Sequence, residues 1–280
     1  MNSDQPRTGT TIVACEYADG VVLGADSRVS TGASTRARTR ERISFGCICR
    51  ETDRAISFDR ERALTMRLSN SSAGIYVSNR ASDKMVALSD FAIMCRSGSA
   101  ADTEALAGFV RRVVEEHETE LGASADVKTV ATVATKIAYQ NKGFNQGRGL
   151  SAYTIIGGWD ARRGPQVYAS TAGGNMVKER WTTDGSGSTY IWGFLDDGWR
   201  EGMTREQCEA FVARAIALAM SVDGSSGGCI RLNTVNASGI HRTFIQGNDI
   251  PPVLGELPQV RGRPEIARHG HQGASGGMIL

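Results

Sequence analysis

The sequence lacks any long apolar run, and this absence bears on the class of protein. No stretch of its 280 residues reaches the ~18 apolar residues of a membrane-spanning helix. Residues 1–9 are polar, so we expect no secretory signal there. A net charge of +2 is too small to indicate a nucleic-acid partner or an acidic lipid surface. We therefore expect a globular protein that binds neither membranes nor nucleic acids.

Histidine is also scarce, and the motifs of several enzyme classes are missing. The four histidines lie on a predicted helix, on a predicted strand and near the C-terminus, which disfavours a Ser-His-Asp site. The six cysteines match no zinc spacing and indicate mostly buried thiols in a reducing compartment. No H-E-x-x-H motif, P-loop or dinucleotide fingerprint occurs. G-x-S-x-G patterns at 224–228 and 273–277 lack the strand-turn-helix context of a nucleophile elbow. We expect no metal and no cofactor.

Segments with strand and helix character come in blocks. Asp19-Gly20 between two β-rich runs predicts a hairpin, whereas apolar residues recur every three or four positions from Leu106 and from Val127, as in amphipathic helices. Ser99 and Thr204 open predicted capping boxes, and the Thr204 helix should stop at Asp223. The expected order is strands (11–17, 21–25, 92–95), two helices, strands (152–159, 166–170, 176–181), one or two helices, and strands (229–235, 240–245). Such blocks favour an α+β fold with antiparallel sheets over a parallel, doubly wound sheet.

Two segments do not fit this compact plan. Residues 33–74 hold nine arginines and no lysine, interleaved with acids. The alternating apolar residues at 43–49 resemble a strand without an obvious partner. The acids and the lack of an aromatic stacking set argue against nucleic-acid binding. We expect an atypical insert, either disordered or translated from an intron. Residues 256–280 have no periodicity and are expected to form a flexible tail.

One chemistry remains open to this chain, and it depends on threonine. Residues 8–11, Thr-Gly-Thr-Thr, directly precede the first predicted strand. A threonine inside a chain has no attached base, but at a chain terminus its own α-amino group, with a pKa of roughly 7.7–8.0, can take the hydroxyl proton. That requires cleavage after Gly9. On its own, a threonine before a strand usually reflects β propensity.

The surrounding residues resemble the mature beta subunits of the eukaryotic 20S proteasome. The matching stretches, in the family's order, are 9–14, 20–28, 78–84, 96–102, 185–188, 200–204 and 223–228. Outside 1–8, 33–74 and the tail, the resemblance covers nearly the whole chain. It implies an αββα sandwich of the amino-terminal-nucleophile hydrolase type, with one domain at 10–255 behind a propeptide at 1–9 that is removed autocatalytically.

The resemblance also implies the site. Thr10 would be the nucleophile, Lys84 a neighbouring cation and Asp26 its carboxylate partner. Gly98 would offer its backbone N–H to the oxyanion, and Ser30 would hold the substrate as an added strand. The remaining implied positions surround the terminal amine and the nucleophilic water: Ser186, Asp223 and Ser226. Gly9 would precede the processed bond.

Arg96 makes the chain most similar to the caspase-like beta subunits. A guanidinium at the base of the S1 pocket would favour cleavage after Glu or Asp. The resemblance further implies stacked seven-membered rings of alpha and beta subunits that degrade unfolded polypeptides in an ATP- and ubiquitin-dependent manner, in the cytoplasm and nucleus. Two alternatives stay open: a structural ring subunit made inactive by the 33–74 insert or by failed processing, and a bacterial-type two-ring protease, which the Arg96 region disfavours.

Overall fold

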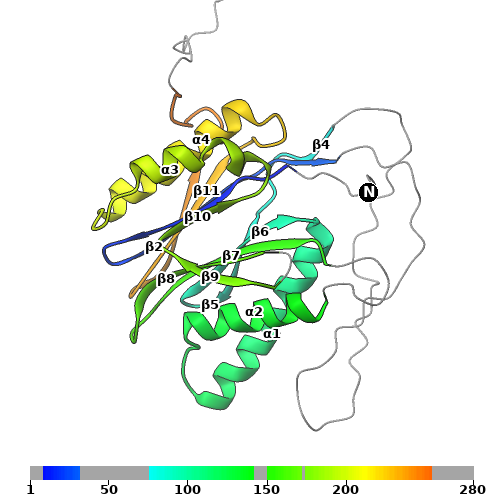
Figure 1. The fold of residues 1–280 in the computed structure, drawn as a ribbon, viewed down its shortest axis with the longest axis vertical. Coiled ribbons are helices and arrows are strands. Elements are labelled where there is room, and N and C mark those ends of the chain that lie inside the picture. The colour runs from blue at the N-terminus through cyan, green and yellow to red at the C-terminus, as the bar shows by residue number, and fades with distance from the viewer. Residues whose placement is uncertain (1–8, 32–75, 142–149, 172–173, 254–280) are drawn as a thin grey trace, which may run out of the picture.

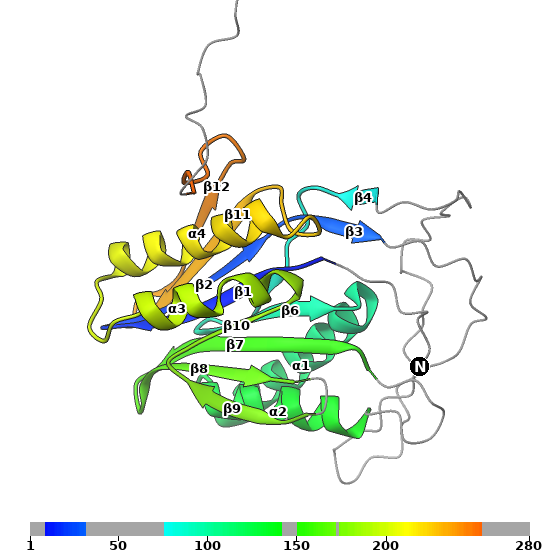
Figure 2. The ribbon, with the colours of Figure 1, turned by 45° about the horizontal axis from the view of Figure 1, so that its top comes forward.

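A computed structural model of the chain describes residues 9–31, 76–141, 150–171 and 174–253. Two five-stranded antiparallel sheets lie face to face, and a pair of helices covers the outer face of each sheet (Figures 1 and 2). The expected α+β class and its αββα sandwich are confirmed. No helix among the described residues is long and apolar enough to cross a membrane.

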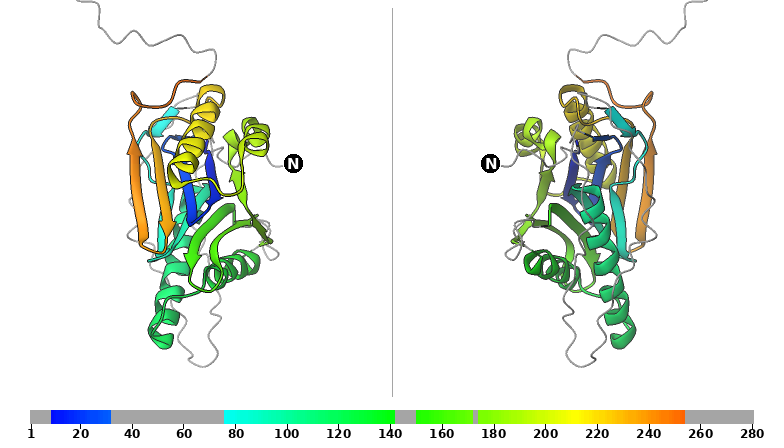
Figure 3. Two further views of the ribbon diagram at one scale, coloured as in Figure 1. Left: turned by 90° about the vertical axis from the view of Figure 1, so that its left-hand side faces the viewer. Right: turned by 90° about the vertical axis from the view of Figure 1, so that its right-hand side faces the viewer.

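The first sheet carries the N-terminal hairpin at its centre. In spatial order its strands are β10 (Trp181–Asp184), β1 (Ile12–Tyr17), β2 (Gly20–Asp26), β11 (Ile230–Asn236) and β12 (Gly239–Ile245). Its outer face is covered by α3 (Trp192–Gly198) and α4 (Arg205–Val222). Figure 3 shows the two edges of this sheet, with β12 at one side of the molecule and β10 near α3 at the other.

The second sheet is covered by the two central helices, α1 (Ala100–Leu121) and α2 (Val127–Gln140). In spatial order its strands are β5 (Met85–Ser89), β6 (Ala92–Gly98), β7 (Ala152–Asp160), β8 (Gly164–Ser170) and β9 (Met176–Glu179). A separate two-stranded ribbon pairs β3 (Val29–Thr31) with β4 (Tyr76–Asn79). A short 3-10 helix at Ser186–Tyr190 follows β10.

Three apolar clusters fill the spaces between the four layers. Ile12 and Ala14 belong to the cluster between the sheets, whereas Val13 and Cys15 belong to the cluster beneath α4. Successive side chains of a strand point to opposite faces. Both faces of β1 are therefore buried, which explains why residues 12–15 form an unbroken apolar run instead of alternating with polar residues.

Close packing of α4 on β2 helps to position the site. A Cβ at Gly24 would lie 2.6 Å from side-chain atoms of Val212 and Ile216. Glycine therefore lets the helix approach the strand closely. This contact fixes α4 over β2 near the strand's last residue, Asp26, and the helix ends at its C-cap, Asp223.

Most of the predicted elements are confirmed. The hairpin pairs Tyr17 with Gly20, as the Asp19-Gly20 turn indicates. The apolar stripe predicted to begin at Val127 is buried on α2: Val127, Val130, Ala131, Ala134, Ile137 and Ala138. Thr204 and Gln207 form the expected capping box, and Ser99 accepts a hydrogen bond from the Asp102 N–H at the start of α1.

The strand predicted at 176–181 is wrong in one respect. It consists of two strands in different sheets, because β9 pairs with β8 and β10 pairs with β1. Arg180 lies between them, where the chain crosses from one sheet to the other. The run Met-Val-Lys-Glu-Arg-Trp contains no turn residue at this crossing, so the sequence does not reveal it. The predicted strands also left out β3, β4 and β5, and no residues were assigned to α3, the second of the one or two helices expected before β11.

The predicted propeptide, insert and tail depend on residues outside the described ranges. These include 1–8, the 33–74 segment with its strand-like stretch at 43–49, and 256–280. Their boundaries stay predictions. Of the cysteines within the described ranges, Cys15, Cys95 and Cys208 are buried and Cys229 is partly buried, as expected for structural thiols.

Candidate active site

Thr10 lies two residues before the start of β1, where several elements end close together. The residue is only 4% exposed. Four segments distant in sequence converge here: the end of β2, the start of β5, the 3-10 helix after β10, and the C-terminus of α4. The predicted catalytic residues come from these segments, and the fold brings six of them into one hydrogen-bonded network.

The centre of this network is a buried ion pair. Lys84 Nζ lies 2.6 Å from Asp26 Oδ1, and the two side chains are 6% and 0% exposed. Burial lowers the pKa of the Lys84 ammonium, and the Asp26 carboxylate opposes that effect by favouring the charged form. The ammonium can therefore release a proton more readily than an exposed lysine.

Asp26 is held in place by backbone donors. Its Oδ1 accepts a hydrogen bond from the Thr11 N–H at 2.8 Å, and its Oδ2 accepts from Gly227 N–H at 3.0 Å and Arg28 N–H at 3.3 Å. These donors satisfy a carboxylate that has no access to water. They also fix its orientation toward Lys84.

A second carboxylate anchors the other side of Thr10. Asp223 Oδ2 accepts hydrogen bonds from the hydroxyls of Ser186 and Ser226, each at 2.7 Å. Ser186 Oγ in turn accepts a hydrogen bond from the Thr10 N–H at 3.1 Å. Burial raises the pKa of Asp223, but the hydrogen bonds from Ser186, Ser226 and the Ser225 N–H outweigh it and lower the pKa below its ordinary value.

The carbonyl of Gly9 faces both the hydroxyl and the cation. Thr10 Oγ1 donates a hydrogen bond to Gly9 O at 2.7 Å, and Lys84 Nζ donates to the same oxygen at 3.0 Å. A Cβ at Gly9 would lie 2.1 Å from the Cβ of Ser225. The backbone before Thr10 therefore fits into a space that only glycine can occupy.

The other predicted site residues lie outside this network. Gly98 ends β6 with φ +105°, and a Cβ there would lie 2.5 Å from the Ser151 carbonyl oxygen, so glycine is required. Ser30 lies on β3, where it pairs with Val77 of β4. Arg96 lies beside the site, since its backbone N–H donates to the Lys84 carbonyl at 2.9 Å.

The Arg96 guanidinium is mostly enclosed, with its side chain 12% exposed. One terminal nitrogen forms an ion pair with Glu104 of α1, and the other donates to the Asp83 carbonyl at 3.0 Å. The buried Nε has no hydrogen-bond partner among the described residues. The guanidinium is thus held in place and retains an unused donor.

Sequence reasoning did not identify Thr11 and Glu104. Thr11 is fully buried, and its hydroxyl lies 2.8 Å from Ser226 Oγ. Nothing in the pattern separates that threonine from an ordinary strand residue. Glu104 could have been found, because the Ser99 cap places it in the first turns of a helix that begins directly after the strand of Arg96.

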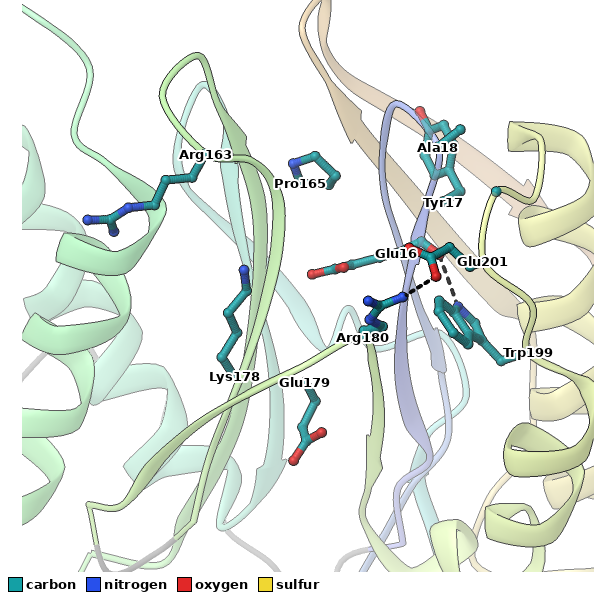
Figure 4. Close-up of a pocket in the computed structure, with 11 residues that line it drawn as sticks. Glu16, Tyr17, Ala18, Arg163, Pro165, Lys178, Glu179, Arg180, Trp199 and Glu201 are labelled. Atoms are coloured by element: carbon teal, nitrogen blue, oxygen red, sulfur yellow. Dashed lines mark hydrogen bonds and ion pairs between the residues drawn. The ribbon is translucent and has the colours of Figure 1, made fainter.

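A separate cavity of about 630 Å³ opens at the far end of β1, away from Thr10. Glu16 projects into it from β1 and Lys178 from β9, while Arg180 and Glu201 form an ion pair at 2.7 Å beside it (Figure 4). No predicted site residue lines this cavity. Among the described residues, no cluster of His, Cys, Asp and Glu could hold a metal ion.

Two antiparallel five-stranded sheets between two layers of helices form the αββα sandwich of the amino-terminal-nucleophile hydrolase fold. Residues 6–45 and 64–235 match the family model described as proteasome subunit. The chain belongs to this family, within its beta subunits. Such membership implies assembly with other proteasome subunits. The match leaves out residues 46–63, a shorter stretch than the predicted insert.

Individual relatives agree with this assignment. The chain is 36% identical over 251 residues to proteasome subunit beta type-6 of Arabidopsis thaliana, covering 89% of this chain and 88% of that protein. It is 37% identical over 243 residues to the beta type-6 subunit of Dictyostelium discoideum, covering 87% and 92%. It is 36% identical over 247 residues to a probable beta type-1 subunit of Schizosaccharomyces pombe, covering 88% of each.

Proposed function

We propose that this subunit is a threonine endopeptidase of the 20S core, with Thr10 as the nucleophile once residues 1–9 are removed. One observation carries the proposal: the Gly9 carbonyl accepts hydrogen bonds from both the Thr10 hydroxyl and the Lys84 ammonium. The bond that must break, the group that attacks it and a cation that would stabilise the developing charge thus meet at one point.

The first reaction is autolysis of the Gly9–Thr10 peptide bond. Thr10 Oγ attacks the Gly9 carbonyl carbon, its hydroxyl proton is transferred in net terms to the Thr10 nitrogen, and the Lys84 ammonium stabilises the oxygen that becomes negative. The C–N bond then breaks as the Thr10 nitrogen takes a proton, leaving an ester between Gly9 and Thr10 Oγ. Water hydrolyses this ester, so that Gly9 ends in a carboxylate and Thr10 regains its hydroxyl beside a free amine.

The mature enzyme would repeat this chemistry on substrates. The free α-amine of Thr10 takes the hydroxyl proton, and Oγ attacks the substrate carbonyl to form an acyl ester. The proton passes to the leaving amine, and water then hydrolyses the ester. Ser186, Asp223 and Ser226 hold the amine, since the Thr10 nitrogen already donates to Ser186. Lys84 with Asp26 stabilises the deprotonated hydroxyl.

Three residues outside the network would bind the substrate. The Gly98 N–H would stabilise the oxyanion, and Ser30 would hold an extended substrate beside β3 through backbone hydrogen bonds. Arg96 would select acidic P1 side chains, because its enclosed guanidinium can donate charge-assisted hydrogen bonds to a carboxylate. In the assembled core the subunit would cleave unfolded polypeptides after Glu or Asp in ATP- and ubiquitin-dependent degradation, in the cytoplasm and nucleus.

The second candidate is a catalytically inactive ring subunit. It draws support from residues 46–63, which the family model leaves unmatched. Intact-mass measurement of this chain in purified particles separates the two candidates. A catalytic subunit should begin at Thr10, and its Thr10→Ala variant should assemble but keep the residues before position 10 and lose cleavage after acidic residues. A wild-type chain that retains Gly9 in working particles would exclude the catalytic proposal.

A further inference from the structure

The Arg96 guanidinium already has a carboxylate partner within this chain. One of its terminal nitrogens is in contact with Glu104, which lies on α1 eight residues further along. This is the same kind of group that an acidic P1 residue would present. From this contact we propose that Glu104 is a specificity-determining residue, an internal carboxylate that occupies Arg96 in the empty site and is displaced by an acidic P1 side chain. The proposal rests on the P1 role of Arg96.

The exposure of the two side chains differs in a way that suits this role. Arg96 is 12% exposed, whereas Glu104 is 71% exposed. A nearly buried guanidinium without a counter-charge is costly, so Glu104 stabilises the empty pocket. A carboxylate that remains largely in water loses little when it leaves the pair, because exposed ion pairs contribute little to stability. Glu104 can therefore turn into solvent while Arg96 stays in place.

Two other contacts explain why Arg96 would keep its position after Glu104 leaves. Its second terminal nitrogen donates to the Asp83 carbonyl at 3.0 Å, and its backbone N–H donates to the Lys84 carbonyl at 2.9 Å. Neither contact involves Glu104. The terminal nitrogen that Glu104 vacates would then be available to the substrate, whereas the Nε is enclosed.

In the absence of substrate, the positive charge of Arg96 in the pocket is therefore balanced by the Glu104 carboxylate. An acidic P1 side chain must displace Glu104, which weakens the binding of acidic substrates. A neutral P1 side chain does not face an unpaired cation, so it is rejected less strongly. Removing the Glu104 charge should therefore increase the preference for acidic over neutral P1 residues, chiefly through KM, since the effect acts on substrate binding.

The test uses purified particles that carry Glu104→Gln in this subunit. Matched fluorogenic peptides with P1 Glu and P1 Gln give the preference, and particles with Thr10→Ala give the background from other subunits. We expect the Glu-to-Gln ratio of kcat/KM to rise roughly two- to five-fold, the contribution of an exposed ion pair. Glu115→Gln removes the same charge from the same helix, where Glu115 pairs with Arg111, and should leave the ratio unchanged.

Repeating the measurement in particles that carry Arg96→Gln distinguishes a failure of this inference from a failure of the proposed P1 role of Arg96. If Arg96→Gln removes the acidic preference and Glu104→Gln then has no further effect, both ideas stand. If Arg96→Gln retains the preference, the P1 role of Arg96 fails. If Arg96→Gln removes the preference but Glu104→Gln leaves the wild-type ratio unchanged or lowers it, only the competitor role fails. The competitor role also fails if Glu104→Gln raises the ratio without Arg96.

Discussion

Lys84 and Asp26 are joined by an ion pair of 2.6 Å between side chains that are almost entirely enclosed. Lys84 also donates to the Gly9 carbonyl, and Asp26 accepts the Thr11 N–H on the other side of Thr10. The two residues next to the proposed nucleophile in the chain are thus bound by the two halves of one ion pair. The same contact therefore neutralises the two buried charges and positions Thr10.

Replacing Lys84 with methionine tests this coupling. The change keeps the volume but leaves the Asp26 carboxylate buried without its cation, which should destabilise the folded chain by about 3–5 kcal/mol. It should also block removal of residues 1–9. The measurements are the denaturant midpoint of the isolated chain and its intact mass in assembled particles. Lys128→Met, at an exposed position on α2, should change neither. Normal processing of Lys84→Met would contradict the role given to the cation.

Thr11 should position Ser226 through its hydroxyl. The Ser226 hydroxyl donates to Asp223, so the proton between Thr11 and Ser226 must come from Thr11. Thr11→Val keeps the shape of the side chain but leaves a buried acceptor unsatisfied, which should cost about 1–3 kcal/mol. We expect roughly ten-fold lower kcat and a shifted pH profile, because Asp223 also holds the Ser186 hydroxyl. Thr11→Ser keeps the hydroxyl and should restore both kcat and the pH profile. If it does not, the loss of activity in Thr11→Val is caused by altered packing.

Gly9 should be required for processing because of its surroundings. An added Cβ would overlap the Ser225 side chain and backbone, so Gly9→Ala must shift the carbonyl away from Lys84 and Thr10. We expect processing to slow by at least about ten-fold if that carbonyl is the group attacked. Pulse-chase mass analysis of the precursor measures the rate. Gly193→Ala is the control, because apart from its chain neighbours and the backbone of its own helix no heavy atom lies within 4 Å of the added carbon. An unchanged rate in Gly9→Ala would mean that the site reaches another geometry.

Periodicity predicted the fold well where a single face of an element is buried. The stripes of α1, α2 and α4 followed from apolar spacing and caps, because a helix end and its buried face both leave local signals. The division of residues 176–181 between two sheets left no such local signal in the sequence. Which sheet a strand joins depends on partners distant in sequence, here β8 for one half and β1 for the other.

The site residues were reachable from the sequence only through family resemblance. Asp26, Lys84 and Asp223 are separated by many residues, and nothing local indicates that they meet. The resemblance supplied their positions but not the hydrogen bonds of Thr11 or the ion pair of Glu104 with Arg96. Those contacts depend on how side chains fill the space between elements, which only the structure provides.

The Asp223 carboxylate should make the stability of the folded chain depend on pH in the acidic range. Its hydrogen bonds to Ser186, Ser226 and Ser225 lower its pKa below the ordinary value of 3.8. A group with a lowered folded pKa stabilises the fold above its unfolded pKa and loses that contribution as pH falls through its folded pKa. We therefore expect Asp223→Asn to lower the thermal unfolding midpoint at pH 6, with the difference from wild type shrinking as the pH falls below about 4. Thermal unfolding of the isolated chain between pH 6 and pH 3 measures this, with Asp197→Asn, on α3, as the charge-matched control. A wild-type advantage that stayed constant down to pH 3 would mean that Asp223 stabilises the site through contacts that do not require its charge.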